Sequence, residues 1–527
     1  MTTGQESGQL PGIHASIGTL AGGHAVRRRP RRVDDRIPQL PPQRLRNPFP
    51  PIEVLSGDQV ESIHQASLQI LRDTGLEVLG DRALDILGRA GAQVDRGTRR
   101  VRLDPGLTEE LIASAPRTFT LHARNPAWTV PVGGDSLVFC AVGGPAFATD
   151  LDRGRRAGTF ADMCDLTRLI QHLNIVHQEG GGAVEPTDIA VPIRHLEMYR
   201  AFATLTDKTW HCLGFGRRPV DDAIEMACLV RGVSRERLAD EPSVITVINT
   251  NSPLRFDGPM SEGLIEMALN GQPVIATPFT LAGAMSPATL AGALALQNAE
   301  ALFMIALGQA ARPGAPVVYG GFTSNVDMRT GSPAFGTPEY VKAQLATGQM
   351  ARRYGIPWRS SNATASSVVD AQAAYESEMS LWGCVLGGAS IVYHCAGWLE
   401  GGLTASFEKL ILDAELLQQM AEVLRPVVVD EAELGLEAIA EVGPGGHFFG
   451  SAHTLERYET AFYRPILSDW RNFETWHDDG ARTATERANG VWKRLLAEYV
   501  PPPMEPGVRE ELDAFVERRT AEIERNG

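Results

Sequence analysis

Carboxylate, amide and aromatic side chains follow one another closely in residues 360–376, SSNATASSVVDAQAAYE. The stretch lies between two segments whose apolar composition predicts buried core, and it carries Asn362, Asp370, Gln372, Tyr375 and Glu376. Aromatic faces can hold a positive charge, and nearby carboxylates and amides can fix its orientation. The stretch therefore indicates a binding site for a small cation. Asp370 also has a structural explanation, because it stands where the N-cap of a helix belongs.

Side chains of the same kinds end several other apolar segments. They are Glu179, Phe215, Asn249, Asn251, Arg255, Phe279, Phe322, Asn325, Asp327, His394, Trp398 and Glu400. Any single phenylalanine among them is explained equally well by inward packing in a barrel. As a set, the aromatic, amide and acidic residues favour a pocket for a small cation.

The segments that must position these residues alternate between buried strands and amphipathic helices from about residue 160 onward. We expect strands at 174–180, 209–215, 243–250, 273–279, 316–322, 357–361, 389–395 and 447–451. We expect helices near 191–205, 220–230, 259–270, 287–311, 337–354, 371–387 and 406–425. This alternation predicts an α/β fold, a TIM-type (β/α)8 barrel whose functional face lies at the C-terminal ends of the strands. A doubly wound open sheet is the alternative, because strand order cannot be read from strand count.

Four regions are expected along the chain. Residues 1–50, rich in Gly, Pro and Arg, predict a disordered or surface-draped arm. Residues 51–158 predict a mixed α+β subdomain, which includes a strand-like run at 128–139. Residues 159–455 would form the barrel, and 456–527 a helical extension that packs on it.

Charge and cysteine content restrict the partners of the chain. Its 527 residues carry a formal net charge of −15 at pH 7, which argues against a polyanionic partner such as nucleic acid. The six cysteines include no CxxC pair, as is typical of a reducing cytoplasm. We expect no apolar run of the roughly 18 residues needed to span a bilayer and no signal peptide. The sequence thus predicts a cytoplasmic protein that binds neither nucleic acid nor membrane, and we also expect a homo-oligomer.

Several long motifs occur in an order that resembles one enzyme family. They are INTNSPLRFDG (248–258), TPFTLAGAMSPATLAGALALQNAEAL (277–302), YGGFTSNVDMRTGSPAFGTPE (319–339), DAQAAYE (370–376) and HTLERY (453–458). Together they resemble the trimethylamine methyltransferase family, from about residue 55 to the C-terminus. The resemblance implies a barrel enzyme that moves a methyl group from a methylated amine to the cobalt of a separate corrinoid protein. The chain has no corrinoid-binding motif of its own, so the partner would supply the cobalamin.

One departure from the family bears on the substrate. Archaeal trimethylamine enzymes that this sequence resembles carry pyrrolysine in the barrel, at a position within or close to 361–367, and this chain has ordinary residues there. Relatives without pyrrolysine include enzymes that act on quaternary amines such as glycine betaine. The resemblance therefore favours a quaternary ammonium substrate over trimethylamine.

The chemistry of a quaternary amine suggests roles for the candidate residues. The nitrogen leaves as a neutral tertiary amine, so its departure requires no general acid. Aromatic rings would restrain the cation with less ground-state stabilisation than a paired carboxylate gives. We expect an aromatic wall of Phe215, Phe279, Phe322, Tyr375 and Trp398.

Polar residues would complete that site. Glu376, Asp327 and Glu400 are the candidate catalytic residues that tune or orient the cation, with Glu179 as a further candidate. A betaine carboxylate would bind Arg255, by bidentate hydrogen bonds, or Asn251. The remaining candidates for substrate binding are Asn362, Gln372 and His394.

Other readings of the sequence stay open. His211–Cys212 and His394–Cys395 raise the question of zinc, but neighbours on a strand face opposite sides, so each pair offers one inward ligand and we expect no metal site. A sensory barrel that binds the ligand without turnover is one alternative. A hydrolase or lyase that uses Asp327, Glu376 and Glu400 as acid and base is another.

Overall fold

A computed structural model describes residues 37–526 of the chain, and the first 36 residues of the predicted N-terminal arm lie outside the described part. Its main sheet has nine strands in the order β1-β7-β20-β19-β16-β14-β12-β11-β10. The strands are β1 (Leu45–Arg46), β7 (Ser136–Phe139), β10 (Gln178–Glu179), β11 (Thr209–His211), β12 (Val244–Ile248), β14 (Val274–Ala276), β16 (Val317–Gly320), β19 (Trp358–Ser361) and β20 (Ile391–Tyr393). Neighbours from β7 round to β10 are parallel, whereas β1 is antiparallel to β7.

The two ends of the parallel sheet meet. Cys140 and Gln178 form an isolated parallel bridge beyond β7 and β10. Ala141 donates its backbone N–H to the Gln178 carbonyl at 3.0 Å, and His177 donates to the Phe139 carbonyl at 2.9 Å. The sheet is therefore curled on itself rather than open, so the alternative of a doubly wound open sheet is wrong.

Seven of the eight predicted strands are present in shorter form, and the eighth prediction is wrong. Residues 448–450 form a 3-10 helix in which Phe449 is 86% exposed. The eighth parallel strand is β7, which comes from the segment predicted as a separate N-terminal subdomain. A strand inside a parallel sheet must be buried on both faces, and all four residues of β7 are buried.

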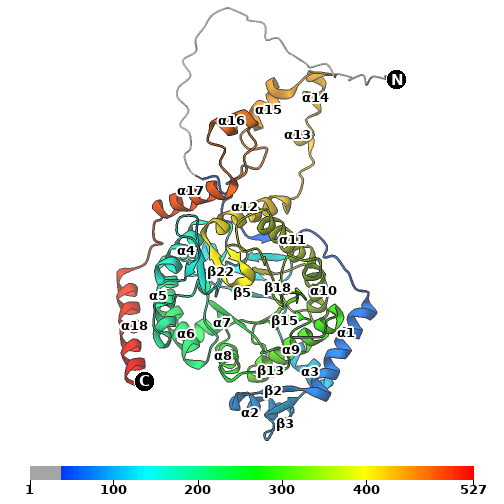
Figure 1. Cartoon of the computed structure of the whole chain (residues 1–527), viewed down its shortest axis with the longest axis vertical. Helices are drawn as coiled ribbons and strands as arrows, with labels where there is room; N and C mark the ends of the chain where they lie inside the picture. Colours follow the sequence, from blue (N-terminus) through cyan, green and yellow to red (C-terminus); the bar gives the residue numbers. More distant parts are fainter. Residues whose placement is uncertain (1–36, 527) are drawn as a thin grey trace, which may run out of the picture. The chain divides into compact units, whose positions relative to one another are not determined.

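Helices alternate with these strands and surround the sheet (Figure 1). They are α4 (Phe160–His172), α5 (Val191–Leu205), α6 (Arg217–Arg231), α8 (Gly258–Leu269), α9 (Leu290–Ala311), α10 (Pro338–Tyr354), α11 (Ala371–Gly387) and α12 (Phe407–Val423). Several begin at a side-chain cap, as at Asp370, whose carboxylate accepts the Ala373 N–H at 3.1 Å. The structural explanation for Asp370 is therefore confirmed.

Helix α9 is long and apolar enough to cross a membrane by length and composition, so the expectation that the chain lacks such a segment is wrong. Its most apolar window is 83% buried inside the protein. A helix that is apolar on all sides and covered by other elements is a core helix.

A hairpin closes one end of the curled sheet. Strands β5 (Phe119–Leu121) and β6 (Val130–Val132) are antiparallel, and their Leu121, Val130 and Val132 form one apolar cluster with residues of the parallel strands. The backbone N–H of His122 donates to the Pro242 carbonyl, just before β12 begins. The hairpin thus covers the N-terminal ends of the strands.

Short sheets flank the C-terminal ends of the strands. Strands β15 (Phe279–Ala282), β17 (Phe322–Val326) and β18 (Pro333–Ala334) form one of them. Strands β21 (Trp398–Leu399), β22 (Thr404–Ser406), β8 (Phe147–Thr149) and β9 (Arg156–Ala157) form another. Because β15, β17 and β21 directly follow β14, β16 and β20, both sheets are built at the C-terminal end.

A further small sheet lies in the N-terminal region. It has the order β13-β2-β4-β3 and joins β13 (Arg255–Phe256) to β2 (Leu76–Val78), β4 (Arg100–Arg102) and β3 (Gln93–Asp95). Its neighbours are α1 (Gly57–Gln69), the π-helix η1 (Ile70–Thr74), α2 (Asp81–Arg89) and α3 (Pro105–Ala113).

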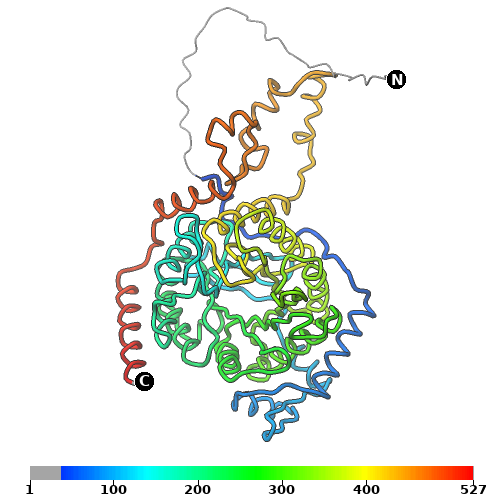
Figure 2. Tube along the Cα trace, in the orientation of Figure 1, coloured from blue at the N-terminus to red at the C-terminus, as the bar shows by residue number. Residues whose placement is uncertain are grey.

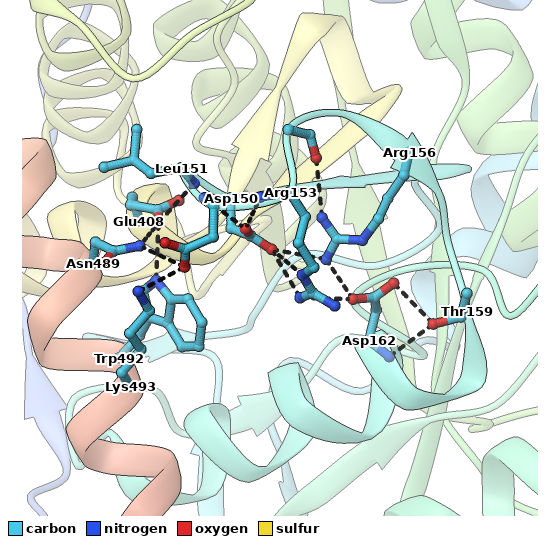
Figure 3. Close-up of polar contacts among 12 residues, drawn as sticks. Asp150, Leu151, Arg153, Arg156, Thr159, Asp162, Glu408, Asn489, Trp492 and Lys493 are labelled. Carbon is cyan, nitrogen blue, oxygen red and sulfur yellow. Dashed lines mark hydrogen bonds and ion pairs between the residues drawn. The ribbon is translucent and has the colours of Figure 1, made fainter.

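The last helices, α17 (Ala484–Ala497) and α18 (Pro506–Asn526), pack on the helices around the sheet; Figure 2 shows α18, in red, beside α5 and α6. The buried Glu408 of α12 accepts the indole N–H of Trp492 at 2.9 Å and the Asn489 amide at 2.8 Å, both from α17 (Figure 3). In the same figure, the guanidinium groups of Arg153 and Arg156 join Asp150 to Asp162. The contacts of Glu408 thus attach helix α17 of the C-terminal extension to α12, one of the helices around the sheet.

Candidate active site

A cavity of about 530 Å³ with convergent side chains lies at the C-terminal ends of the parallel strands. Its lining comes from the ends of β7, β10, β11, β12, β14, β16, β19 and β20 and from the loops that follow them. Rim and floor differ in exposure: Phe215 and Leu403 are more than half exposed, whereas Arg359 is 1% exposed. The cavity therefore runs from an accessible rim to a buried floor.

Aromatic rings form one wall of the cavity, with Phe322 at their centre. Its ring centroid lies 5.3 Å from Phe279, 5.9 Å from Trp398 and 6.0 Å from His394. The Trp398 and Phe322 planes are nearly perpendicular, at 83°. This wall offers both faces and edges of rings to an occupant, and ring faces attract cations.

Gly402 allows Trp398 to lie against the rim. A Cβ atom at this position would stand 2.5 Å from the Trp398 ring, and its φ of +100° is one that L side chains rarely adopt. Any other residue would therefore displace the indole.

Two neutral imidazoles continue the wall. The His211 ring stacks on Tyr393 at 4.8 Å, and the Tyr393 and His394 centroids are 4.0 Å apart. Burial lowers the pKa of His211 to about 3 and that of His394 well below its usual range, with the Arg359 guanidinium adding to both effects. Neither ring adds a positive charge near neutral pH.

His394 has an unusual backbone conformation. Its φ is +53°, in the left-handed region that a non-glycine residue rarely adopts, and it directly follows the last residue of β20. Such strain is found at functional sites, where it directs a side chain that regular geometry would point elsewhere. Here it brings the imidazole within 4.1 Å of the Trp398 ring.

Arg359 supplies a positive charge at the floor. It lies on β19, and its guanidinium carbon stands 4.8 Å from the Tyr393 centroid and 5.3 Å from that of Phe322. Its Nε and Nη1 atoms are buried without a hydrogen-bond partner, and no ion pair reaches it within residues 37–526. Burial lowers its pKa. Most buried charges are paired, so this arrangement requires an explanation.

Glu179 lies behind the lining. Its fully buried carboxylate accepts the backbone N–H groups of Gly181 at 2.6 Å and Gly182 at 2.9 Å. Burial raises its pKa to about 7, although the backbone hydrogen bonds act in the opposite direction. Since Gly180 and Gly181 line the cavity, Glu179 shapes the wall from outside and does not itself face an occupant.

The structure brings five of the predicted site residues to the cavity. They are Phe215, Phe279, Phe322, His394 and Trp398. Asn249, noted at a strand end but given no role, also lines it. The other predicted residues lie elsewhere.

Glu376 and its neighbours on α11 act on the loop after β19. The buried Glu376 carboxylate accepts the Thr364 hydroxyl and the backbone N–H groups of Ala365 and Ser366. Gln372 donates its amide to the same carboxylate at 2.8 Å. Tyr375, 58% exposed, points away from the cavity lining.

Thr364 links this loop to the aromatic wall, because its carbonyl accepts the Trp398 indole N–H at 3.1 Å. Glu400 follows Trp398 and pairs with Arg155 at 2.9 Å, while its backbone N–H donates to Ser366. Glu376 and Glu400 therefore hold in place the segments that position the Trp398 ring in the aromatic wall.

Three further predicted residues are remote from the lining. Asp327 accepts the Arg329 N–H and the Thr330 hydroxyl in an exposed turn after β17. Arg255 lies in the small N-terminal sheet, 53% exposed, and pairs with Glu77 at 3.2 Å. Asn251 is exposed and donates its backbone N–H to the Arg255 carbonyl.

Asn362 is buried at the end of β19 and donates its side-chain amide to the Cys395 carbonyl at 2.9 Å. It thereby ties the ends of β19 and β20 together below the loop.

Sequence reasoning did not identify Arg359, Tyr393 or Thr277, and it considered His211 only as a possible zinc ligand, although all four line the cavity. They lie within predicted strands, whereas the candidates were taken mainly from the ends of those strands and from the loops that follow. An arginine inside a segment that should be buried on both faces was the available signal.

The question of a metal site has a geometric answer in the described part of the chain. Cys140 and His211 approach to 3.4 Å between Sγ and Nε2, but no three His, Cys, Asp or Glu residues gather there. Burial raises the pKa of the Cys140 thiol well above its usual range, so it is a protonated group.

Comparisons with known proteins identify relatives over nearly the whole chain. A model of the family described as Trimethylamine methyltransferase (MTTB) matches residues 21–524. The chain is 37% identical to a glycine betaine methyltransferase of Desulfitobacterium hafniense over 476 residues, 90% of this chain and 98% of that protein. It is 29% identical to trimethylamine methyltransferase MttB of another strain of that organism, over 88% of this chain and 93% of that one.

Among solved structures, monomethylamine methyltransferase of Methanosarcina barkeri aligns with a TM-score of 0.49 at 10% identity, over 84% of this chain and 92% of that one. On the family match and the similarity to the glycine betaine enzyme, the chain belongs to the trimethylamine methyltransferase family.

Proposed function

We propose that this protein transfers a methyl group from a quaternary amine of the glycine betaine type to Co(I) of a corrinoid protein. Family membership and the relative named a glycine betaine methyltransferase support the reaction class. The observation that carries the proposal is the aromatic wall of Phe279, Phe322 and Trp398 at the C-terminal ends of the strands. Within this wall a quaternary ammonium group finds ring faces instead of a paired carboxylate.

The reaction needs no proton. The corrinoid supplies a Co(I) electron pair, which forms a bond to the methyl carbon while the C–N electron pair goes to nitrogen. The amine leaves as a neutral tertiary amine. The positive charge on nitrogen decreases during the reaction. A tight ion pair would stabilise the bound substrate more than the transition state and so raise the barrier, whereas weaker contacts with aromatic rings stabilise the bound substrate less.

The chain's own contribution is position. The wall would hold the ammonium group so that one methyl faces the rim, where the partner can approach. Favourable positioning can lower a barrier by about 7–11 kcal/mol. The aromatic rings around the ammonium group would help to exclude water from the methyl carbon, which would protect the nucleophile.

We assign Phe215, Phe279, Phe322, His394 and Trp398 to substrate contact. Glu376 and Glu400 are positioning residues in this proposal, since Glu376 fixes Thr364, and Thr364 holds Trp398. Asp327, Arg255 and Asn251 have no part in it. The acid–base hydrolase alternative loses support, because its three acidic residues do not line the cavity.

For the fold, we infer a TIM-type (β/α)8 barrel with β7 as the eighth strand, which moves the barrel's beginning ahead of residue 159. The alternation of parallel strands and helices and the bridge between β7 and β10 support this inference. Six unbonded cysteines support a cytoplasmic location. The corrinoid protein would provide the cobalamin, and a homo-oligomer is an expectation of the same proposal.

The test is methyl transfer by the purified protein. Cob(I)alamin, free or bound to a corrinoid protein, is incubated with glycine betaine, proline betaine, carnitine or trimethylamine. We expect methylcobalamin and an equal amount of demethylated amine from at least one betaine and none from trimethylamine. Trp398→Leu should slow the reaction, whereas Phe449→Leu, an exposed aromatic residue far from the cavity, should not. Binding of a betaine without transfer under every condition would instead favour the sensory alternative.

A further inference from the structure

The charge at the floor of the cavity restricts what the cavity can hold. Among the described residues that line it, only Glu185 and Arg359 are charged at neutral pH. The Glu185 side chain is 30% exposed and is paired with Arg194 at 2.5 Å. The floor therefore carries one buried positive charge that no acidic side chain balances.

The ionisable groups that act on the Arg359 guanidinium do not supply the missing negative charge. They are Tyr340, Tyr393, Cys140 and Cys384. Burial raises the pKa of each of them above neutral pH, so all four are uncharged. The surrounding rings stabilise the guanidinium only in part, through Phe322 and Tyr393.

A second unpartnered donor faces the same space. Thr277 lines the cavity and is buried, and its hydroxyl has no hydrogen-bond partner among the described residues. Thr277 and Arg359 flank Gly320, which pairs with Arg359 in the sheet register. A Cβ atom at Gly320 would stand 1.9 Å from the Thr277 Oγ1, so the missing side chain leaves the gap between the two donors open.

We propose that Arg359, with Thr277, binds the carboxylate of a zwitterionic substrate at the floor, so that the cavity takes carboxylated quaternary amines and excludes simple cations. The inference deepens the proposed function and rests on it. A guanidinium donates two parallel hydrogen bonds to a carboxylate, and a neutral hydroxyl adds a third.

The geometry also fixes the direction of the substrate. Arg359 lies at the buried end, and the Phe322 centroid, 5.3 Å from the guanidinium, begins the aromatic wall. A carboxylate on Arg359 thus places an ammonium group one or two carbons away against the rings. Its methyl groups then face Phe215 and Leu403 at the rim.

Simple cations lack what the floor requires. Tetramethylammonium or choline would bring a second positive charge beside an unbalanced guanidinium, in surroundings of low dielectric constant where repulsion is strong. The rival assignment, Arg255, is already paired with Glu77 and lies in another sheet.

Calorimetric binding without corrinoid tests the inference, with glycine betaine, choline and tetramethylammonium as probes. We expect the unaltered protein to bind glycine betaine at least about 10-fold more tightly than either cation. Arg359→Met removes charge-assisted hydrogen bonds and should weaken betaine binding by about 10- to 100-fold. It should also improve tetramethylammonium binding, because the repulsion is gone.

Control variants separate this effect from damage to the fold. Arg425→Met changes an exposed arginine paired with Glu422 at 3.1 Å and should leave every affinity unchanged. Thr277→Val keeps the side-chain shape and should weaken betaine binding several-fold. If Arg359→Met does not fold, the unaltered protein and Thr277→Val still decide the question.

Equal affinity of the unaltered protein for tetramethylammonium and betaine would overturn the inference, as would loss of betaine binding in Arg255→Met but not in Arg359→Met. Methyl transfer from choline or tetramethylammonium, but not from betaine, would overturn the inference and the betaine-type substrate, and would leave only the reaction class, methyl transfer from a quaternary amine to Co(I), standing. Selective betaine binding without any methyl transfer would support the inference and contradict the proposed function.

Discussion

Replacing Phe322 by leucine tests whether the aromatic wall recognises charge. Phe322 is 6% exposed, and its ring contacts Phe279, Phe335, Tyr340, His394 and Trp398 with centroid distances of 5.2–6.0 Å. A leucine side chain approximately conserves volume, so the change should reduce the free energy of unfolding by less than about 1.5 kcal/mol. It removes one ring from the wall, and one cation–π contact contributes about 0.5–2 kcal/mol.

A neutral ligand of the same shape isolates this contribution. In 3,3-dimethylbutyrate a carbon replaces the nitrogen of glycine betaine, so shape and carboxylate are kept and the positive charge is absent. Any disturbance of Arg359, which also contacts Phe322, affects both ligands and cancels in the ratio of their affinities. Measured by calorimetry, the preference for betaine over the neutral ligand should fall by about 2- to 30-fold in Phe322→Leu.

The same preference in Phe322→Leu and the unaltered protein would refute the argument that the wall holds a cation. The matched control is Phe462→Leu, which removes an aromatic side chain that is 83% exposed. That variant should keep both affinities.

Three further predictions concern buried charges. Burial raises the pKa of Glu179 from 4.5 to about 7, so the native state keeps a proton that the unfolded chain loses. The free energy of unfolding should therefore fall as the pH rises from about 4.5 to 7, by up to about 1.4 kcal/mol per pH unit. Urea unfolding should show that slope reduced in Glu179→Gln; an unchanged slope contradicts the assignment. Lys409→Met leaves the buried Asp413 unpaired and should lower stability by about 3–5 kcal/mol, whereas the double variant Lys409→Met/Asp413→Leu should lose less by thermal unfolding. Glu408→Ala leaves the Trp492 indole N–H without an acceptor, at a cost of about 1–3 kcal/mol, and limited proteolysis should release the C-terminal helices sooner; equal rates would speak against this contact.

Much of the sheet could be predicted because most of its buried parallel strands are rich in apolar residues. The run at 243–250 contains strand β12, Val244–Ile248, and the run at 357–361 contains β19, Trp358–Ser361. The predicted runs include flanking residues such as Asn249 and Pro357, because composition does not mark where the pairing of a strand ends. The helices could be predicted equally well, because N-cap residues such as Asp370 mark where they begin.

The eighth strand could not be assigned in this way. Residues 447–451 have the aromatic composition of a strand, yet Phe448 and Phe449 are exposed in the structure. Strand β7 comes before the first predicted repeat, and long-range pairing, with β20 on one side and the start of β10 on the other, makes it part of the parallel sheet. The composition of a segment indicates whether it is buried on average, but it does not indicate which other segment of the chain packs against it.

Only part of the candidate site could be predicted from the sequence. Aromatic residues directly after strands, such as Phe279 and Phe322, reach the cavity because the position after a strand points them there. Acidic residues further along the loops, such as Asp327, have directions set by local turns. Arg359 was missed because it lies inside a strand, where alternation alone decides that it faces inward.

A crystal structure of the protein with glycine betaine tests the central claim most directly. We expect the carboxylate within hydrogen-bond distance of the Arg359 guanidinium, the trimethylammonium group against Phe279, Phe322 and Trp398, and one methyl facing the rim. Betaine in the opposite orientation, with its ammonium group toward Arg359, or betaine outside this cavity, would contradict the account.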